Sequence, residues 1–155
     1  MKRTRLEGTP CPVARALDAV GDGWSLLIVR DAFDGLRRFG EFQKSLGLAK
    51  NILATRLRSL VAEGVLELAP ASDGSAYQEY VLTPKGRGLF HVVVGLRQWG
   101  EDHCFAPGED RSVLVDLPAE RPVRRLQLHA QDGRLLGPDD AVVKKAPVRK
   151  ARAKR

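Results

Sequence analysis

The sequence predicts a mainly α-helical fold that carries one small β-hairpin and ends in a small β-rich appendage. Three observations lead to this prediction. Apolar residues recur at helical spacing in several segments between residues 12 and 62, and again between residues 84 and 103. Apolar and polar residues alternate on both sides of a turn-forming segment at residues 71–76. After Phe105 the helical spacing stops and the composition changes.

Two helices are predicted at the start of the chain, separated by a glycine-rich connector. Pro12 fits the first helical position, because the N–H that proline lacks has no intrahelical partner there. An apolar stripe then runs through VARALDAV at residues 13–20. After Gly21, Asp22 is a plausible N-cap for a second helix that begins with WSLLIVRDAF. No predicted strand precedes the connector, so it lacks the context of a dinucleotide-binding loop.

A short helix and a longer one follow. Residues 33–38, FDGLRR, predict a turn and, as an option left open, one short strand. The segment FGEFQKSL at residues 39–46 predicts a helix that ends at Gly47, with Phe39, Phe42 and Leu46 facing inward. The segment AKNILATRLRSLVAE at residues 49–63 predicts a further helix, which stops at Gly64.

A hairpin and the longest helix come next. VLELA at residues 65–69 and YQEYVL at residues 77–82 predict the two strands. Thr83 as N-cap and Pro84 as first residue predict the start of a helix that continues without a break to His103. Its apolar residues cover more than the single stripe that a surface helix needs, so we expect it to meet both its own core and another subunit.

The appendage is predicted at residues 106–143. SVLVDL at residues 112–117 and VRRLQLHA at residues 123–130 are expected to be strands, and QDGR at residues 131–134 carries a hairpin-type turn signal. Residues 144–155 lack apolar periodicity and are predicted to be a disordered basic tail.

The predicted order of elements is that of a winged helix-turn-helix, followed by a long C-terminal helix suited to dimerisation. In this fold the second helix of the helix-turn-helix enters the major groove of DNA, and the hairpin forms the wing. The sequence therefore predicts a partner, double-stranded DNA.

The net charge of +7 gives this prediction no support, because of where the charge lies. The rest of the chain holds as many basic as acidic side chains once the seven of the tail are set aside: Lys144, Lys145, Arg149, Lys150, Arg152, Lys154 and Arg155. As a disordered arm the tail would add salt-sensitive affinity for any DNA; otherwise it is a solubilising terminus.

Several classes of function are disfavoured by the sequence. The chain has two cysteines, three scattered histidines, and no C-x-x-C or H-E-x-x-H, so we expect neither a metal site nor a cofactor. No nucleophile–base pair, paired catalytic carboxylates or phosphate loop stands out, so we expect no enzyme. With no apolar transmembrane run and no signal peptide, we expect a cytoplasmic, nucleoid-associated protein without a membrane partner.

Three segments, which together cover about residues 11–104, carry a family resemblance: CPVARALDAVGDGWSLLIVRDAFDGLRRFGEFQKSLGLAKNILATRLRSLVAEGVLEL, EYVLTPKGRGL and WGEDH. They give the sequence a resemblance to the HxlR-type, MarR-like winged-helix transcriptional regulators. The resemblance implies a bacterial homodimer with contacts from the first and last helices. It also places residues 1–10 as an N-terminal arm, residues 11–105 as the DNA-binding and dimerisation domain, and residues 106–155 outside the family core.

Two departures from the family pattern concern the DNA-binding surface. Ala49 stands where family members often have Ser or Thr as the cap of the recognition helix, a loss on the order of 1 kcal/mol. The wing segment PASDGSAYQ contains no basic residue, and Tyr77 stands near the expected arginine. We therefore expect the wing to contribute less phosphate contact than usual.

Candidate DNA contacts follow from a helical wheel of residues 50–62. Leu53, Leu57 and Leu60 define the buried side, and Asn51, Thr55 and Arg58 fall on the opposite face. Asn51 and Arg58 are candidate base readers, because Asn pairs with adenine and Arg with guanine, while Thr55 suits a thymine methyl group or a phosphate. The candidates for phosphate contact are Arg37, Arg38, Lys44, Lys50 and Arg56. For Arg56, on the flank, an intramolecular salt bridge is the alternative; for all of these residues the alternative is a solvated helix face.

Cys11 and Cys104 are the redox candidates. Cys11 directly precedes a helix N-terminus, where the helix dipole favours the thiolate, and Arg15 would act in the same direction. Several members of the family sense oxidants or electrophiles through a cysteine in this place. Cys104 ends the long helix and could approach Cys11 of a partner subunit. The alternative is that Cys11 is only a small apolar residue at a cap.

The sequence thus predicts a sequence-specific, homodimeric DNA-binding regulator that responds to oxidants or electrophiles through Cys11. Two alternatives remain open. One is a nucleoid-type architectural protein that binds DNA through its basic tail with little sequence choice. The other is a regulator with no redox role that binds an unidentified small-molecule effector, for which Trp24 and Trp99 could line a pocket.

Overall fold

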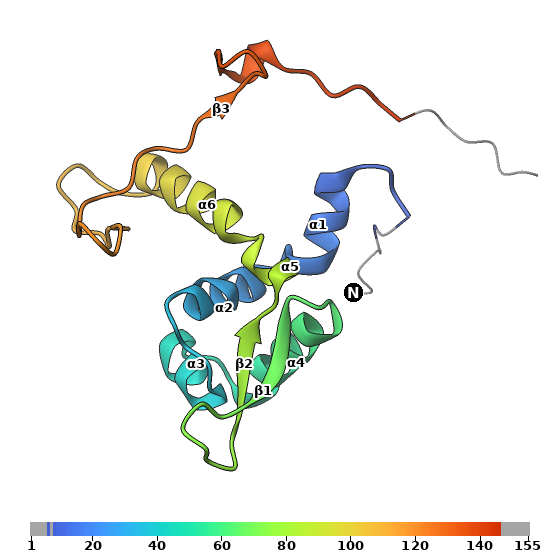
Figure 1. Cartoon of the computed structure of the whole chain (residues 1–155), viewed down its shortest axis with the longest axis vertical. Helices are drawn as coiled ribbons and strands as arrows, with labels where there is room; N and C mark the ends of the chain where they lie inside the picture. Colours follow the sequence, from blue (N-terminus) through green and yellow to red (C-terminus); the bar gives the residue numbers. More distant parts are fainter. Residues whose placement is uncertain (1–5, 7, 147–155) are drawn as a thin grey trace, which may run out of the picture. The chain divides into compact units, whose positions relative to one another are not determined.

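The computed structural model describes residue 6 and residues 8–146, which fall into two units (Figure 1). Unit 1 comprises residues 1–109 and unit 2 residues 110–155. The helices and strands of unit 1 follow the predicted order as far as β2: α1 (Pro12–Val20), α2 (Gly23–Phe33), α3 (Phe39–Leu46), α4 (Lys50–Ala62), β1 (Leu66–Pro70), β2 (Gln78–Leu82), α5 (Pro84–Arg87) and α6 (Phe90–His103).

Local sequence signals explain several of these boundaries. The Asp22 carboxylate accepts a hydrogen bond from the Ser25 N–H at 2.9 Å, so Asp22 caps α2 as predicted. Gly47 after α3 and Gly64 after α4 both have a left-handed backbone, with φ of 64° and 70°. The hydroxyl of Thr83 accepts from the Gly86 N–H at 3.0 Å, which confirms it as the cap of α5.

The core of unit 1 lies between α2, α3, α4 and the hairpin. The hairpin is antiparallel, with Leu66 opposite Leu82 and Pro70 opposite Gln78. The largest fully buried side chains come from every one of these elements or from their immediate ends: Phe42, Ile28, Leu53, Leu57, Leu60, Leu66, Val29 and Val65. Three helices closed by a two-stranded wing confirm the predicted mainly α-helical, winged helix-turn-helix fold.

The short strand considered for residues 33–38 does not form. These residues end α2 and then make a turn and extended backbone. One hydrogen bond of the kind that joins neighbouring strands is present: the Tyr80 N–H of β2 donates to the Arg37 carbonyl at 2.7 Å. The segment before α3 is therefore attached to the edge of the wing without becoming a third strand.

The prediction of one unbroken helix from Thr83 was wrong. The helix is interrupted at Gly88 and Leu89, which separate the four-residue α5 from α6. Gly86 and Gly88 lower the local helix propensity. Gly86 also packs against the backbone of Val65, where an added Cβ would lie 2.1 Å from the Val65 carbonyl oxygen. Packing against the hairpin thus fixes α5 as a separate turn.

Unit 2 has less strand than predicted. SVLVDL is not a strand; it contributes a single bridge between Val115 and Pro122. In the second predicted strand only Leu128–His129 (β3) pairs, with β4 (Leu135–Leu136), across the expected turn. A short 3₁₀ helix, η1, covers Pro138–Asp140. No residue between 110 and 146 is buried, so unit 2 has no core of its own in the described chain to hold longer strands together.

Candidate nucleic-acid interface

The outward face of α4 is the centre of the candidate interface. Leu53, Leu57 and Leu60 are at most 1% exposed and fix the rotation of the helix. Asn51, Thr55 and Arg58 are all exposed, as the helical wheel predicted. The Thr55 hydroxyl donates to the Asn51 carbonyl at 2.9 Å, one turn earlier. Two candidate readers and the residue between them therefore share one solvent-facing surface.

Ala49 gives α4 no side-chain cap, as its sequence implies. The helix nevertheless begins at Lys50, with the Leu53 N–H donating to the Ala49 carbonyl at 3.0 Å. Lys50 and, on α3, Lys44 are exposed. The side chains considered for phosphate contact therefore lie at the start of α4 and near the end of α3.

Arg56 takes part in the intramolecular contact that the sequence left open. Its Nε lies 3.5 Å from Oδ1 of Asp22, the same oxygen that caps α2. Arg56 is half-buried, in contrast to Arg58. The two arginines of α4 consequently differ: one ties α4 to the start of α2, and the other points to solvent.

Arg37 and Arg38 lie between α3 and the wing, where carboxylates surround them. Arg37 Nη1 is 3.5 Å from Glu79 Oε2, and Arg38 Nη2 is 2.5 Å from Asp73 Oδ2 and 3.8 Å from Glu79 Oε1. The Arg38 guanidinium also lies 5.6 Å from the centre of the Tyr77 ring, within range of a cation–π contact. The absence of a basic residue in the wing is thus offset by arginines that precede α3.

Hydrogen bonding favours the charged form of these carboxylates. The backbone N–H of Ser72 is the main cause of the lowered pKa of Glu79, and the Ser72 hydroxyl and Arg37 add to it. The N–H and hydroxyl of Ser75, followed by Arg38, hold the pKa of Asp73 well below its usual range. At neutral pH both wing carboxylates are therefore ionised and can pair with the arginines.

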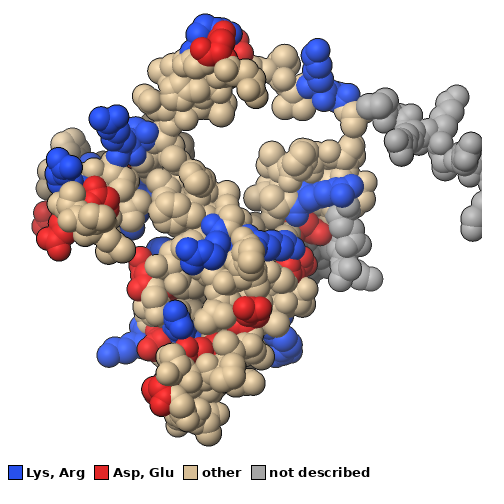
Figure 2. All heavy atoms as spheres, in the orientation of Figure 1, with Lys and Arg blue, Asp and Glu red and all other residues tan. Residues whose placement is uncertain are grey.

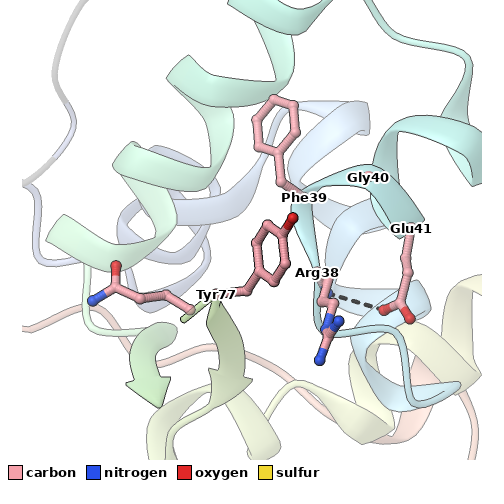
Figure 3. A pocket seen from close by; sticks show the side chains of 6 residues that line it. Arg38, Phe39, Gly40, Glu41 and Tyr77 are labelled. Atoms are coloured by element: carbon pink, nitrogen blue, oxygen red, sulfur yellow. Dashed lines mark hydrogen bonds between the residues drawn. The ribbon is translucent and has the colours of Figure 1, made fainter. Parts of the chain in front are cut away.

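A hollow opens where the start of α3 faces the wing (Figure 3). The Glu41 carboxylate bonds back to the Arg37 and Arg38 N–H groups at 2.8 and 3.0 Å, which closes the first turn of α3 and lowers the pKa of Glu41. In Figure 3 the Tyr77 ring lies beside Phe39, and Glu41 lies on the opposite side of Arg38. The residues that line the hollow are Arg38, Phe39, Gly40, Glu41, Tyr77 and Gln78.

The surface charge is mixed. On the face drawn in Figure 2, Lys and Arg side chains are interspersed with Asp and Glu side chains and do not form one continuous basic patch. Lys144 and Lys145 of the tail are exposed. The other basic residues of the tail, Arg149, Lys150, Arg152, Lys154 and Arg155, lie outside the described residues.

Both cysteines are free and exposed. Cys11 is the N-cap residue of α1, and Cys104 is the C-cap residue of α6. The Arg15 guanidinium binds the backbone before the helix, where its Nε donates to the Thr9 carbonyl at 2.6 Å. The structure therefore places the thiols at the ends of the two helices predicted to form the dimer contact.

Apolar side chains of α1 and α6 are exposed to solvent. On α6, Val94 faces the core at 6% exposure, whereas Val92, Leu96 and Trp99 are 47%, 51% and 60% exposed. On α1, Val13 and Leu17 are exposed in the same way. Because Val92, Leu96 and Trp99 are spaced four and three residues apart, they form one stripe, which we call the α6 stripe. The helix therefore has both buried and exposed apolar residues, but the predicted second face of Val92 and Val94 was wrong, since Val94 is buried and Val92 is exposed.

Two kinds of feature are absent from the part of the chain that the structure describes. Residues 8–146 contain no group of three or more His, Cys, Asp or Glu side chains placed to hold a metal ion. Each helix in the same range is too short or too polar to cross a bilayer.

Three helices, a wing and an exposed polar face on the helix-turn-helix define a winged helix-turn-helix protein. Residues 19–107 match the family model described as HxlR-like helix-turn-helix. This match covers more than half of the chain, and the chain therefore belongs to the HxlR-like helix-turn-helix family.

Known proteins similar to this chain are transcriptional regulators. An HTH-type transcriptional regulator of Mycobacterium bovis, Mb3122, is 45% identical over 66% of this chain and 64% of its own length. The match thus spans less than two thirds of that relative. The solved structure of PA1607, a candidate transcription factor, is 59% identical, has a TM-score of 0.87, and covers 92% of this chain and 100% of its own. The redox regulator HypR in its oxidised form is 31% identical, has a TM-score of 0.56, and covers 62% of this chain and 100% of its own.

The proteins to which this chain is similar are thus named as an HTH-type transcriptional regulator, a candidate transcription factor and a redox regulator. The comparisons also bear on unit 2. The family model ends at residue 107, whereas the match to PA1607 extends over 92% of the chain and so includes most of the residues beyond it. Unit 2 is therefore an addition to the family domain that at least one solved structure shares.

One part of the site was missed by sequence reasoning. Asp73 and Glu79 were not selected, although they pair with both arginines before α3. No local pattern in the sequence indicates this pairing, because Arg37 and Glu79 lie 42 positions apart.

Proposed function

We propose that this protein is a sequence-specific DNA-binding regulator that binds a roughly two-fold symmetric operator as a homodimer. The observation that carries the proposal is the exposed face of α4, where Asn51, Thr55 and Arg58 lie opposite three buried leucines. A dimer of this kind places two such helices about 34–36 Å apart, one turn of DNA.

The side chains divide into two groups. Asn51 and Arg58 read base edges, and Thr55 offers its methyl group to thymine. Lys44 and Lys50, with Arg37 and Arg38, contact phosphates. Arg56 we assign to the ion pair with Asp22, since its guanidinium is half-buried and already has a carboxylate partner.

Genome-wide DNA selection tests the proposal directly. A regulator should enrich one peaked operator motif, and its complex should survive an excess of unrelated DNA. An architectural protein that binds through the basic tail would enrich no motif, and unrelated DNA would displace it. That second result would contradict the proposal.

Arg58→Ala should weaken operator binding by about 1–3 kcal/mol and relax the sequence preference at one position. The reason is that Arg58 is exposed on the outward face of α4. Binding titrations with the operator and with single-base variants measure both effects. Arg87→Ala, which removes the same charge at an exposed residue of α5, is the control. A uniform loss of affinity for all DNA would instead make Arg58 a phosphate contact.

The homodimer of this proposal uses the exposed apolar side chains of α1 and α6. Val13 and Leu17 on α1 and the three residues of the α6 stripe are large apolar side chains exposed to solvent. Exposed apolar patches mark sites of protein–protein contact. The resemblance to dimeric family members supports a second copy of this chain as the partner.

A redox response through Cys11 is the second part of the proposal. Exposure of the Cys11 thiol at a helix N-terminus and the similarity to a protein named as a redox regulator support it. In the strongest form, Cys11 of one subunit and Cys104 of its partner form a disulfide, and their two electrons and two protons pass to the oxidant.

Treatment of the wild-type chain with diamide should produce a dimer on a non-reducing gel that dithiothreitol returns to monomer. Diamide accepts the two electrons and two protons and becomes the hydrazine. Cys11→Ser and Cys104→Ser are the matched controls and should each abolish the dimer band. A wild-type chain that stays monomeric on the gel would contradict the intersubunit bridge.

A further inference from the structure

Glu79 is a buried carboxylate on the wing strand β2. It is 3% exposed, although the wing is otherwise largely open to solvent. Its Oε1 accepts from the Ser72 N–H at 3.2 Å and from the Ser72 hydroxyl at 2.9 Å. Its Oε2 faces Arg37 at 3.5 Å. A buried charge is costly unless such partners surround it, so this arrangement has to be explained.

Glu79 and its partners come from three separate places in the chain. Ser72 lies in the loop of the wing, Glu79 on its second strand, and Arg37 and Arg38 directly before α3. Asp73, at the tip of the loop, adds a second carboxylate that contacts Arg38 at 2.5 Å. Together these contacts attach the wing to the start of the helix-turn-helix.

The contacts of Glu79 and Asp73 with Arg37 and Arg38 also hold two positively charged side chains beside the wing. Residues 66–82 contain Glu67, Asp73 and Glu79 but no lysine or arginine. The positive charge that these contacts place at the wing is that of Arg37 and Arg38, whose side chains remain 53% and 33% exposed. A guanidinium has five N–H donors, so an arginine held by one carboxylate still has donors for a phosphate.

We propose that Glu79 is a positioning residue that holds Arg37 and Arg38 beside the wing for contact with the phosphates of the DNA backbone. Asp73 does the same for Arg38 alone. The inference rests on the proposed DNA binding and deepens it: an acidic residue on the wing strengthens binding to an acidic ligand. It leaves sequence preference unchanged, since the base readers lie on α4.

Glu79→Gln tests this against a matched control, Glu67→Gln. Both variants remove one negative charge from the same hairpin, but Glu67 is exposed on β1. Glu79→Gln should weaken binding to operator and to unrelated DNA alike, on the order of tenfold, and the logarithmic salt dependence should become shallower by up to about 1.8 per subunit. Glu67→Gln should leave binding unchanged or slightly tighter. If Glu79→Gln tightens binding as well, its charge merely repels DNA and the proposal is overturned.

Two further measurements distinguish a lost DNA contact from a structural effect of the Glu79→Gln substitution. Asp73→Asn alters an exposed residue and should reduce the salt dependence by about half as much. In a background that carries both Arg37→Ala and Arg38→Ala, Glu79→Gln should have no further effect on DNA binding, whereas a purely structural role would still show one.

The outcomes separate the two levels of the proposal. If the wild-type chain binds an operator but Glu79→Gln and Asp73→Asn bind like the wild type, the positioning role is overturned and the proposed function stands. If the wild-type chain binds no DNA, the proposed function fails, and the positioning role fails with it.

Discussion

Leu96→Asp is expected to convert the proposed homodimer into monomers and to lower operator affinity by about 10²–10⁴-fold. Leu96 is the middle residue of the α6 stripe and is 51% exposed in the single chain. A carboxylate at the centre of an apolar contact would be buried without a partner on both sides of the two-fold axis. Once the subunits separate, the second half-site no longer benefits from the high local concentration of its partner domain, and the gain in avidity is lost.

Sedimentation and operator titration at the same protein concentration measure the two effects. Leu68→Asp is the matched control, because Leu68 is 46% exposed but lies on β1 of the wing. That variant should keep the oligomeric state of the wild type. A Leu96→Asp chain that remains dimeric would place the dimer contact elsewhere than on α6.

Phe42→Ala is expected to lower the free energy of unfolding by about 3–5 kcal/mol. Phe42 lies on α3 with no exposed surface, and its ring packs edge-on against Tyr80 of the wing, with centroids 6.5 Å apart. Truncation leaves a cavity between the helix-turn-helix and the hairpin, and the rigid α3–α4 turn has little freedom to close it.

Chemical denaturation at one fixed protein concentration measures the loss. The concentration is held constant because association also contributes to apparent stability. Phe105→Ala, at a residue 39% exposed after α6, is the control and should change the free energy of unfolding by about 0.5 kcal/mol or less. Equal losses in the two variants would show that Phe42 is not a core residue of the folded state.

Local signals were sufficient to predict most of unit 1. Capping by Asp22 and Thr83, the glycines after α3 and α4, and the leucine spacing of α4 depend on residues within one or two helical turns. The exposure of Asn51 and Arg58 follows from that leucine spacing alone. Their contact with bases stays a prediction, because it depends on the ligand.

Long-range contacts were beyond the reach of the sequence patterns. The ion pair between Arg37 and Glu79 joins residues 42 positions apart, and no periodicity indicates it. The break after α5 depends on the close approach of Gly86 to the backbone of Val65. In unit 2 the alternating pattern suggested strands, but alternation stabilises a strand only where a core covers one of its faces.

The bond from the Thr55 hydroxyl to the Asn51 carbonyl has a consequence for the entropy of complex formation. The bond selects one χ1 rotamer of Thr55 before any ligand is present, because the hydroxyl is already directed along the helix. Arg58, by contrast, carries about 2 kcal/mol of rotamer freedom that it gives up when it is immobilised. The outward face of α4 therefore combines a preorganised methyl group with a mobile guanidinium. A thymine opposite Thr55 would be recognised almost without conformational cost, and Arg58 would bear most of the ordering.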